Sequence, residues 1–239
     1  YDVFEEKQSS AGADEKEVVL FADTFNRYFE RENLDAAIGV LEAAGYRVHV
    51  AGDGGRRPLC CGRTFLSVGA VAQAKEEAQR SVEALLPFVA RGVSVVGLEP
   101  SCIFGFRDEI PALLKSPEAA ALAGKVMLFE EFLSSERKAG RMNLELNPLG
   151  SKALLHGHCH QKSFGVMSPV QEALKLVPGL EVETVESSCC GMAGSFGYGA
   201  ETIDVSLAMG ELSLLPAVRK AEKDTIIVAD GTSCREQIG

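Results

Sequence analysis

The spacing of apolar residues along the chain predicts short strands alternating with helices. Three short apolar runs have the character of buried parallel strands: Val18–Ala22, Tyr46–Ala51 and Val93–Leu98. Between them, Leu34–Ala44 and Ala70–Ala90 show helical periodicity, and Gly45 ends the first of these helices. Because strands and helices alternate, we predict an α/β fold with parallel sheets and right-handed crossovers.

The same pattern is written twice in the chain. Cys60-Cys61-Gly62 recurs as Cys189-Cys190-Gly191, and Ser101-Cys102 recurs as Ser233-Cys234. We therefore predict an internal duplication: two similar lobes with parallel sheets, related by a pseudo-twofold. The predicted divisions are a linker over 1–17, a first lobe over 18–110, a connecting segment over 111–150 that contains a helix at Glu130–Lys138, and a second lobe over 151–239.

Seven cysteines are the main candidates for chemistry. In both copies they fall where strands end, and the carboxyl ends of parallel strands share one edge of a sheet. Adjacent thiolates suit zinc or iron–sulfur clusters, and the glycine after each pair lets the backbone approach the sulfurs. We predict cofactor-binding roles for Cys60, Cys61, Cys102, Cys159, Cys189, Cys190 and Cys234. The metal ligands among them are predicted in the second copy: Cys159, Cys189, Cys190 and Cys234.

Three histidines and a glycine-rich stretch lie close to the cysteines in the sequence and need not be metal ligands themselves. His156, His158 and His160 would share one face of a strand, where His156 and His160 fit a polar strand end and His158 could tune a cluster. The glycine-rich stretch Cys190–Ala200 fits a loop wrapped around a metal centre better than a phosphate-binding loop.

Composition narrows the class of protein. The chain has 239 residues, 46% of them hydrophobic, and a formal net charge of −10, which makes nucleic acid an improbable partner. An odd number of cysteines cannot all form internal disulfides, so metal or redox chemistry in a reducing compartment fits better. No apolar run is long enough to span a bilayer. Because the chain begins at Tyr1 with a polar, charged segment, we expect a piece of a longer protein.

Five motifs together resemble the cysteine-rich CCG domain family. They are Leu59-Cys60-Cys61-Gly62-Arg63, Glu99-Pro100-Ser101-Cys102, His156-Gly157-His158-Cys159-His160-Gln161-Lys162, Cys189-Cys190-Gly191-Met192-Ala193-Gly194-Ser195-Phe196-Gly197 and Ala229-Asp230-Gly231-Thr232-Ser233-Cys234. The family includes the glycolate oxidase iron–sulfur subunit, the anaerobic glycerol-3-phosphate dehydrogenase C subunit and the heterodisulfide reductase B subunit. The chain looks most like the C-terminal iron–sulfur portion of FAD-linked oxidases of the D-lactate and glycolate type.

The resemblance implies an oxidoreductase component that relays electrons from a flavin to an acceptor through an iron–sulfur cluster of the 4Fe-4S type. It implies an FAD-binding domain or subunit as partner, a quinone or cytochrome as acceptor, and no catalysis by this chain alone. The expected location is the cytoplasm, with the inner face of the membrane as a further option. The chain departs from the family pattern at Thr24, Glu99 and Gly231, where the family places cysteines.

Two other functions compete with electron transfer. In one, the same thiols bind zinc and the chain is a structural or docking module for a flavoprotein. In the other, a cysteine pair performs thiol redox chemistry, which requires an exposed thiolate of low pKa. The sequence does not separate zinc from a cluster, and it is silent on which hydroxy acid is oxidised.

Overall fold

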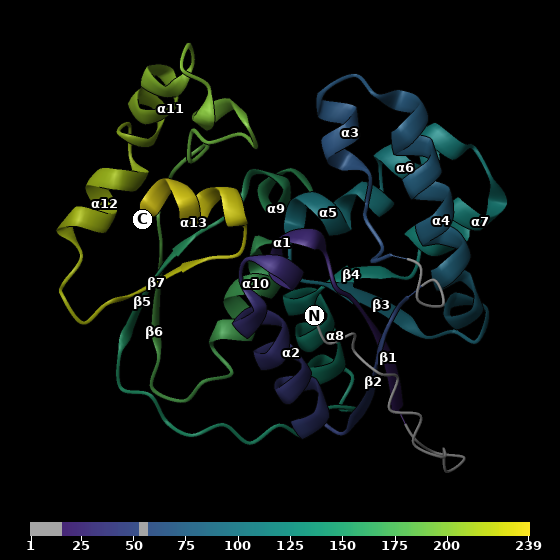
Figure 1. Cartoon of the computed structure of the whole chain (residues 1–239). Coiled ribbons are helices and arrows are strands. Elements are labelled where there is room, and N and C mark those ends of the chain that lie inside the picture. Colours follow the sequence, from purple (N-terminus) through teal and green to yellow (C-terminus); the bar gives the residue numbers. More distant parts are fainter. Residues whose placement is uncertain (1–15, 53–56) are drawn as a thin grey trace. The chain divides into compact units, whose positions relative to one another are not determined.

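A computed structural model describes residues 16–52 and 57–239 of the chain. The chain divides into two compact units, which we call the first and second lobes (Figure 1). The first lobe contains the described residues up to Phe132 together with Glu136–Leu144, and the second contains Leu133–Ser135 and Glu145–Gly239. Each lobe has its own sheet of parallel strands, so the predicted two-lobe α/β fold is confirmed.

The first lobe is built on a four-stranded sheet of order β2-β1-β3-β4. Its strands are β1 (Lys16–Phe21), β2 (Tyr46–Val50), β3 (Ser94–Gly97) and β4 (Val126–Leu128). Its helices are α1 (Thr24–Tyr28), α2 (Arg31–Ala43), α3 (Arg63–Ser67), α4 (Val71–Ala90), α5 (Pro100–Ile103), η1 (Phe104–Phe106), α6 (Glu109–Leu114) and α7 (Pro117–Ala123). Helix α8 (Phe129–Lys138) contributes residues to both lobes.

Helices cover both faces of the first sheet, which explains why its central strand is apolar throughout. On β2, Tyr46 packs against Phe132 of α8 with ring centroids 5.1 Å apart, and His49 packs against Phe88 of α4 at 5.2 Å. Tyr46 and His49 are an odd number of residues apart, so they point to opposite faces. Strand β1, enclosed between β2 and β3, is accordingly buried from Val18 to Phe21.

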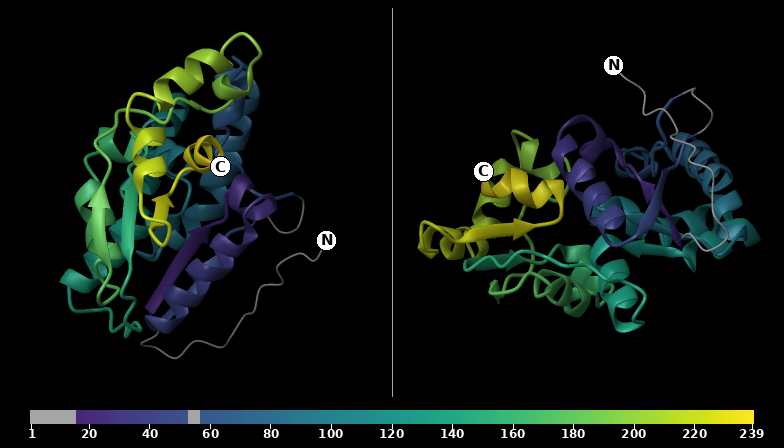
Figure 2. Two further views of the ribbon diagram at one scale, coloured as in Figure 1. Left: turned by 90° about the vertical axis from the view of Figure 1, so that its left-hand side faces the viewer. Right: turned by 90° about the horizontal axis from the view of Figure 1, so that it is seen from below.

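The second lobe is built on a three-stranded parallel sheet of order β6-β5-β7 (Figure 2). Its strands are β5 (Lys152–His156), β6 (Glu181–Thr184) and β7 (Ile226–Ala229). Its remaining elements are α9 (Cys159–Ser163), α10 (Met167–Leu174), η2 (Phe196–Tyr198), α11 (Ile203–Gly210), α12 (Leu214–Lys220) and α13 (Thr232–Ile238). The central strand β5 is buried from Ala153 to His156.

Apart from β4, the two sheets share one strand order and one register. In each, the first strand of the lobe lies in the centre, the second strand pairs on one side and the third on the other. The last residue of β1, Phe21, pairs with Gly97 of β3, and the last residue of β5, His156, pairs with Ala229 of β7. These matches are what a duplication would produce, although the duplication and the pseudo-twofold stay predictions.

Two stretches that were predicted to be a linker and a connecting segment contain further secondary structure. The predicted linker covered 1–17, but Lys16 and Glu17 are the first residues of β1, and residues 1–15 lie outside the described part. The connecting segment was expected to hold one helix at Glu130–Lys138, and it also holds α7 and β4, which pairs with β3. A strand of three residues is too short for its alternation to be recognised. The predicted domain bounds themselves stay predictions.

Within the described ranges, no helix combines the length and the apolar character that crossing a bilayer requires.

Candidate metal centre

The cysteines of the second lobe lie on the loops and helix starts that follow its three strands. Cys159 is the first residue of α9, three residues beyond the end of β5. Cys189 and Cys190 lie on the loop after β6, and Cys234 is in the first turn of α13, after β7. Because the three strands are parallel, their carboxyl ends bring these loops to one edge of the sheet.

A capping box holds the start of α9, and with it Cys159. His158 is the N-cap, and its Nδ1 accepts a hydrogen bond from the backbone N–H of His160 at 3.2 Å. In return, the Gln161 side chain accepts a hydrogen bond from the backbone N–H of His158 at 2.7 Å. Gly231 leaves room for this ring, since a Cβ there would lie 2.4 Å from Cδ2 of His158.

The Cys189-Cys190-Gly191 segment makes a tight turn that only glycine can complete. Gly191 has a φ of +97°, and its N–H donates a hydrogen bond to Sγ of Cys189 at 3.3 Å. A Cβ on Gly191 would lie 2.1 Å from the carbonyl oxygen of Ser206, so no side chain fits there. The turn leaves Cys189 half-buried and places Cys190 in the interior.

Three buried side chains meet inside this edge: His156, Cys190 and Cys234. Their potential ligand atoms all lie within 4.8 Å of one another. Two sulfurs and one imidazole nitrogen are a donor set that zinc accepts, and thiolates are the usual ligands of iron–sulfur clusters. Nε2 of His156 has no oxygen or nitrogen partner in the described structure, so the sulfurs are its neighbours and a metal there would bind a buried atom that lacks a strong hydrogen bond. The residues of the second lobe therefore fit a metal centre.

The surroundings favour the thiolate form of Cys190. The hydrogen bond from Cys234 lowers the pKa of the Cys190 thiol most, burial raises it, and the neighbouring His156 lowers it again. The net direction is downward. Because the thiolate is the form that binds metals, this site is prepared for one.

The structure groups only part of the predicted ligand set. Cys190 and Cys234 belong to the tight group, whereas Cys159 and Cys189 lie outside it in the described structure. All four thiols are nevertheless close enough to act electrostatically on the ammonium of Lys162, whose pKa burial lowers and these thiols raise. The four thiols thus all lie near Lys162, and their role as a joint ligand set stays a prediction.

The three histidines do not share a strand face, because β5 ends at His156. His158 caps α9, and His160 lies within that helix. His156 joins Cys190 and Cys234, whereas the sequence pattern favoured a polar strand end for it, and Nδ1 of His158 lies 3.9 Å from Sγ of Cys159. The available signal was its place as the last residue of the central strand, directly above the edge where ligands gather.

A comparison with protein families matches residues 153–239 to the model of the cysteine-rich CCG domain. The predicted resemblance to the CCG domain family is confirmed for these residues. The matched range contains the whole edge described above, from His156 to Cys234. The CCG domain therefore coincides with the second lobe from β5 onward.

Curated relatives align with more than the CCG domain. The C subunit of the anaerobic glycerol-3-phosphate dehydrogenase of Escherichia coli K12 is 29% identical over 225 residues, covering 93% of this chain and 54% of that protein. D-2-hydroxyglutarate dehydrogenase of Pseudomonas putida is 32% identical over 94% of this chain and 21% of its own length. Lactate utilization protein A of Bacillus velezensis is 26% identical over 93% of this chain and 90% of its length. The chain thus spans about half of the first relative and about a fifth of the second.

The turn formed by Cys189-Cys190-Gly191 recurs in the first lobe at Cys60-Cys61-Gly62. Gly62 has a φ of +80°, and its N–H donates a hydrogen bond to Sγ of Cys60 at 3.5 Å. A Cβ on Gly62 would lie 2.9 Å from the carbonyl oxygen of Ala74. Cys102 occupies the third residue of α5, as Cys234 occupies the third residue of α13. The backbone frame of the site is therefore present in both lobes.

The thiols of the first lobe form a neutral chain of hydrogen bonds. Cys60 donates to Cys61, and Cys61 donates to Cys102. The first bond and then burial raise the pKa of Cys60, and the second bond raises that of Cys61. For Cys102, the bond from Cys61 lowers the pKa, but burial and the nearby charges of Asp23 and Glu99 raise it overall. These thiols are therefore held in their protonated form, which binds metals poorly.

Two buried carboxylates, Asp23 and Glu99, explain in part why the first lobe disfavours a thiolate where the second lobe favours one. Asp23 caps α1 and accepts hydrogen bonds from the N–H groups of Phe25 at 3.0 Å and Asn26 at 3.1 Å. Glu99 caps α5 and accepts one from the N–H of Ser101 at 3.1 Å. Their charges disfavour thiolates beside them. In the described part of the first lobe, Cys60, Cys61 and Cys102 form no metal-binding group as tight as that of the second lobe.

Among the cysteines of the described structure whose pKa is shifted, none is both exposed and of lowered pKa, as thiol redox chemistry requires. Cys159 is exposed as a residue. Its pKa is nevertheless raised, first by partial desolvation of its sulfur and then by the charge of Cys189. Cys190 has a lowered pKa but is buried. A reactive thiolate needs both properties in one residue.

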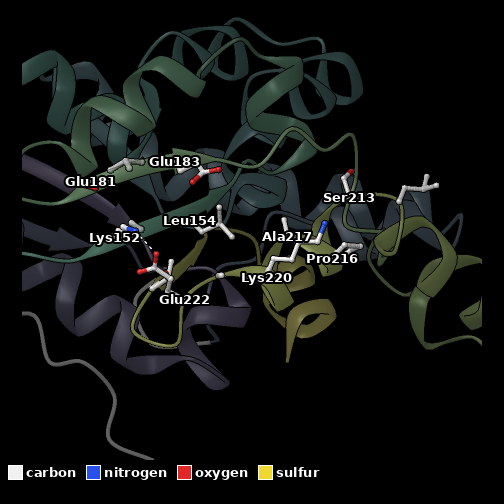
Figure 3. A pocket seen from close by; sticks show the side chains of 14 residues that line it. Lys152, Leu154, Glu181, Glu183, Ser213, Pro216, Ala217, Lys220 and Glu222 are labelled. Carbon is white, nitrogen blue, oxygen red and sulfur yellow. Dashed lines mark hydrogen bonds and ion pairs between the residues drawn. The ribbon is translucent and has the colours of Figure 1, made fainter.

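A separate groove of about 800 Å³ lies in the second lobe between the sheet and α12 (Figure 3). Lys152 and Glu222 form an ion pair of 2.7 Å at its side. None of its fourteen lining residues is a cysteine or a histidine, and they come from β5, β6, α12 and the segments beside α12. The groove is thus distinct from the metal centre.

Proposed function

We propose that this chain is the electron-transfer portion of an FAD-linked dehydrogenase that oxidises a small 2-hydroxy acid. The observation that carries the proposal is the buried group of thiols and imidazole at the carboxyl edge of the CCG domain. The names of the relatives support the reaction class, because two of them are a dehydrogenase and a dehydrogenase subunit. The third is named for lactate utilization, which agrees with a hydroxy acid as substrate.

The proposed cofactor is an iron–sulfur cluster of the 4Fe-4S type, held by Cys159, Cys189, Cys190 and Cys234. Such a cluster, when bound, supplies one-electron reduction and oxidation. The chain contributes the rigid CCG turn that fixes Cys189 and Cys190, and a dry interior around Cys190 and Cys234. It also contributes the positive charge of Lys162, which donates hydrogen bonds to the carbonyl oxygens of Ser187 and Ser188.

The proposed partner is an FAD-binding domain or subunit, and the proposed acceptor is a quinone or a cytochrome. The share of the Pseudomonas putida relative that this chain covers, 21%, leaves ample length there for a flavin domain. Transfer between a flavin and a quinone or cytochrome requires only that the CCG domain accept and release single electrons.

A second function, zinc-stapled docking of the flavoprotein, is favoured by one observation. His156, Cys190 and Cys234 supply mixed nitrogen and sulfur ligands, which is the usual set for a structural zinc site. In that case the metal would stabilise the fold and transfer no electrons.

Metal analysis separates the two functions. We expect the chain, purified without oxygen, to contain about four iron and four sulfide per molecule, as one 4Fe-4S cluster requires. Atomic emission and a sulfide assay make this measurement, and addition of dithionite should bleach the visible absorption. About one zinc per molecule with no sulfide would replace electron transfer by the docking function.

Removal of the charge of Lys162 should change the reduction potential. Lys162→Gln keeps a hydrogen-bond donor near Ser187 but removes a positive charge that favours the more negative, reduced centre. We expect a more negative potential in a redox titration followed by absorbance. Lys152→Gln is the matched control, because Lys152 pairs with Glu222 at the groove. An equal shift in both variants would contradict a specific role for Lys162.

A further inference from the structure

We infer that His156 is a direct metal ligand, through Nε2, together with Cys190 and Cys234. The inference deepens the proposed function, on which it rests for the presence of a metal. It places a nitrogen ligand where the cysteine motifs alone would describe an all-sulfur site, in the position that the exposed thiol of Cys159 would otherwise take, since each iron of a four-iron cluster takes one protein ligand. It also gives a chemical meaning to the last position of the central strand, which is Phe21 in the first lobe and His156 in the second.

The burial of the three groups argues for ligation. His156 is 1% exposed, Cys190 4% and Cys234 2%, so their ligand atoms face one another away from solvent. All of these atoms lie within 4.8 Å of one another, close enough for small side-chain shifts to place a metal between them. Nε2 of His156 has no oxygen or nitrogen partner in the described structure, so the neighbours left to it are the two sulfurs.

The other ring nitrogen is already engaged in the manner of a metal-binding histidine. Nδ1 of His156 lies 2.9 Å from Oγ of Ser187. Lys162 holds this serine by donating to its backbone oxygen. When Nδ1–H donates to Oγ of Ser187, Nε2 carries the lone pair and is directed at the sulfurs. The hydrogen bond therefore fixes both the tautomer and the orientation that ligation requires.

The first lobe offers an internal comparison. Phe21 ends β1 and pairs with Gly97, as His156 ends β5 and pairs with Ala229. Phe21 packs edge-on against Phe106 with ring centroids 4.9 Å apart, so the same strand position is apolar there. An imidazole replaces a phenyl ring only in the lobe whose thiols form the tight group. This difference is expected if the position supplies a ligand in the second lobe.

Cobalt tests the ligand set independently of the native metal. The whole chain is stripped of metal, Co²⁺ alone is added, and X-ray absorption at the cobalt edge is recorded. We expect scattering from one imidazole ring together with sulfur in the unchanged protein. His156→Cys should remove the imidazole signal and add one sulfur, while His156→Gln should weaken Co²⁺ binding at least about 100-fold, beyond what loss of an outer-shell partner causes. The control, His160→Gln, should retain the imidazole signal.

The imidazole signal of the variants decides between the possible results. Loss of the imidazole signal in His156→Cys, with the signal kept in His160→Gln, supports the inference. The inference is overturned by an imidazole signal that persists in His156→Cys, by its absence from the unchanged protein, or by failure to bind Co²⁺. Circular dichroism of each variant establishes that it is folded. Because iron and sulfide are measured on untreated protein, failure of the electron-transfer proposal shows itself separately.

Discussion

Replacing Gly191 with alanine is expected to destabilise the second lobe by about 3 kcal/mol or more. A positive φ costs a residue with a Cβ about 1–2 kcal/mol, and overpacking a filled interior adds about 1–3 kcal/mol. Both apply here, because φ is +97° and the new Cβ would lie 2.1 Å from the carbonyl oxygen of Ser206. Relief of that contact must move α11 or open the turn, which would also displace Cys190.

Urea unfolding of the metal-free protein, followed by circular dichroism, measures this effect. Gly194→Ala is the matched control, since Gly194 has a φ of +67° but open space around its Cβ position. It should cost only the conformational part, about 1–2 kcal/mol. Gly62→Ala in the first lobe should fall between them, with its Cβ 2.9 Å from Ala74. Equal losses for Gly191→Ala and Gly194→Ala would refute the close-packing argument.

Replacing Cys190 with serine is expected to remove nearly all bound metal from the chain. Cys190 is buried beside Cys234 and His156, and its surroundings lower its pKa, so it is the thiolate best prepared for a metal. A serine hydroxyl remains protonated at neutral pH and is a poor ligand for metals that prefer sulfur. Metal content by atomic emission, on protein purified without oxygen, measures the loss.

Cys61→Ser is the matched control in the first lobe. Cys61 follows Cys60 and precedes Gly62, as Cys190 follows Cys189 and precedes Gly191, but it belongs to a chain of neutral thiols whose pKa values are raised. A hydroxyl can replace its thiol in that chain, so bound metal should change little. If Cys61→Ser lost as much metal as Cys190→Ser, the first lobe would also be a metal site.

Much of the architecture was determined by local patterns that a sequence displays directly. Short apolar runs such as Val18–Phe21 mark strands that are buried on both faces, and the helical periodicity between them requires parallel pairing. The strand ends then locate the cysteines at one edge of each sheet. The glycine after each cysteine pair was expected to let the backbone approach the sulfurs, and the N–H groups of Gly62 and Gly191 donate to Sγ of Cys60 and Cys189.

Only the tertiary structure decided which side chains of the site meet one another. Which ligand atoms meet depends on the paths of three loops from β5, β6 and β7, and no periodicity in the chain reports those paths. The loops bring His156 to Cys190 and Cys234, and they leave Cys159 at the surface. The sequence determined that this protein has two parallel α/β lobes with thiols at their edges. Packing across the strands brings distant residues within a few ångströms of one another. It decided that the second lobe gathers a metal-binding group, while Asp23 and Glu99 disfavour the thiolate of Cys102 in the first.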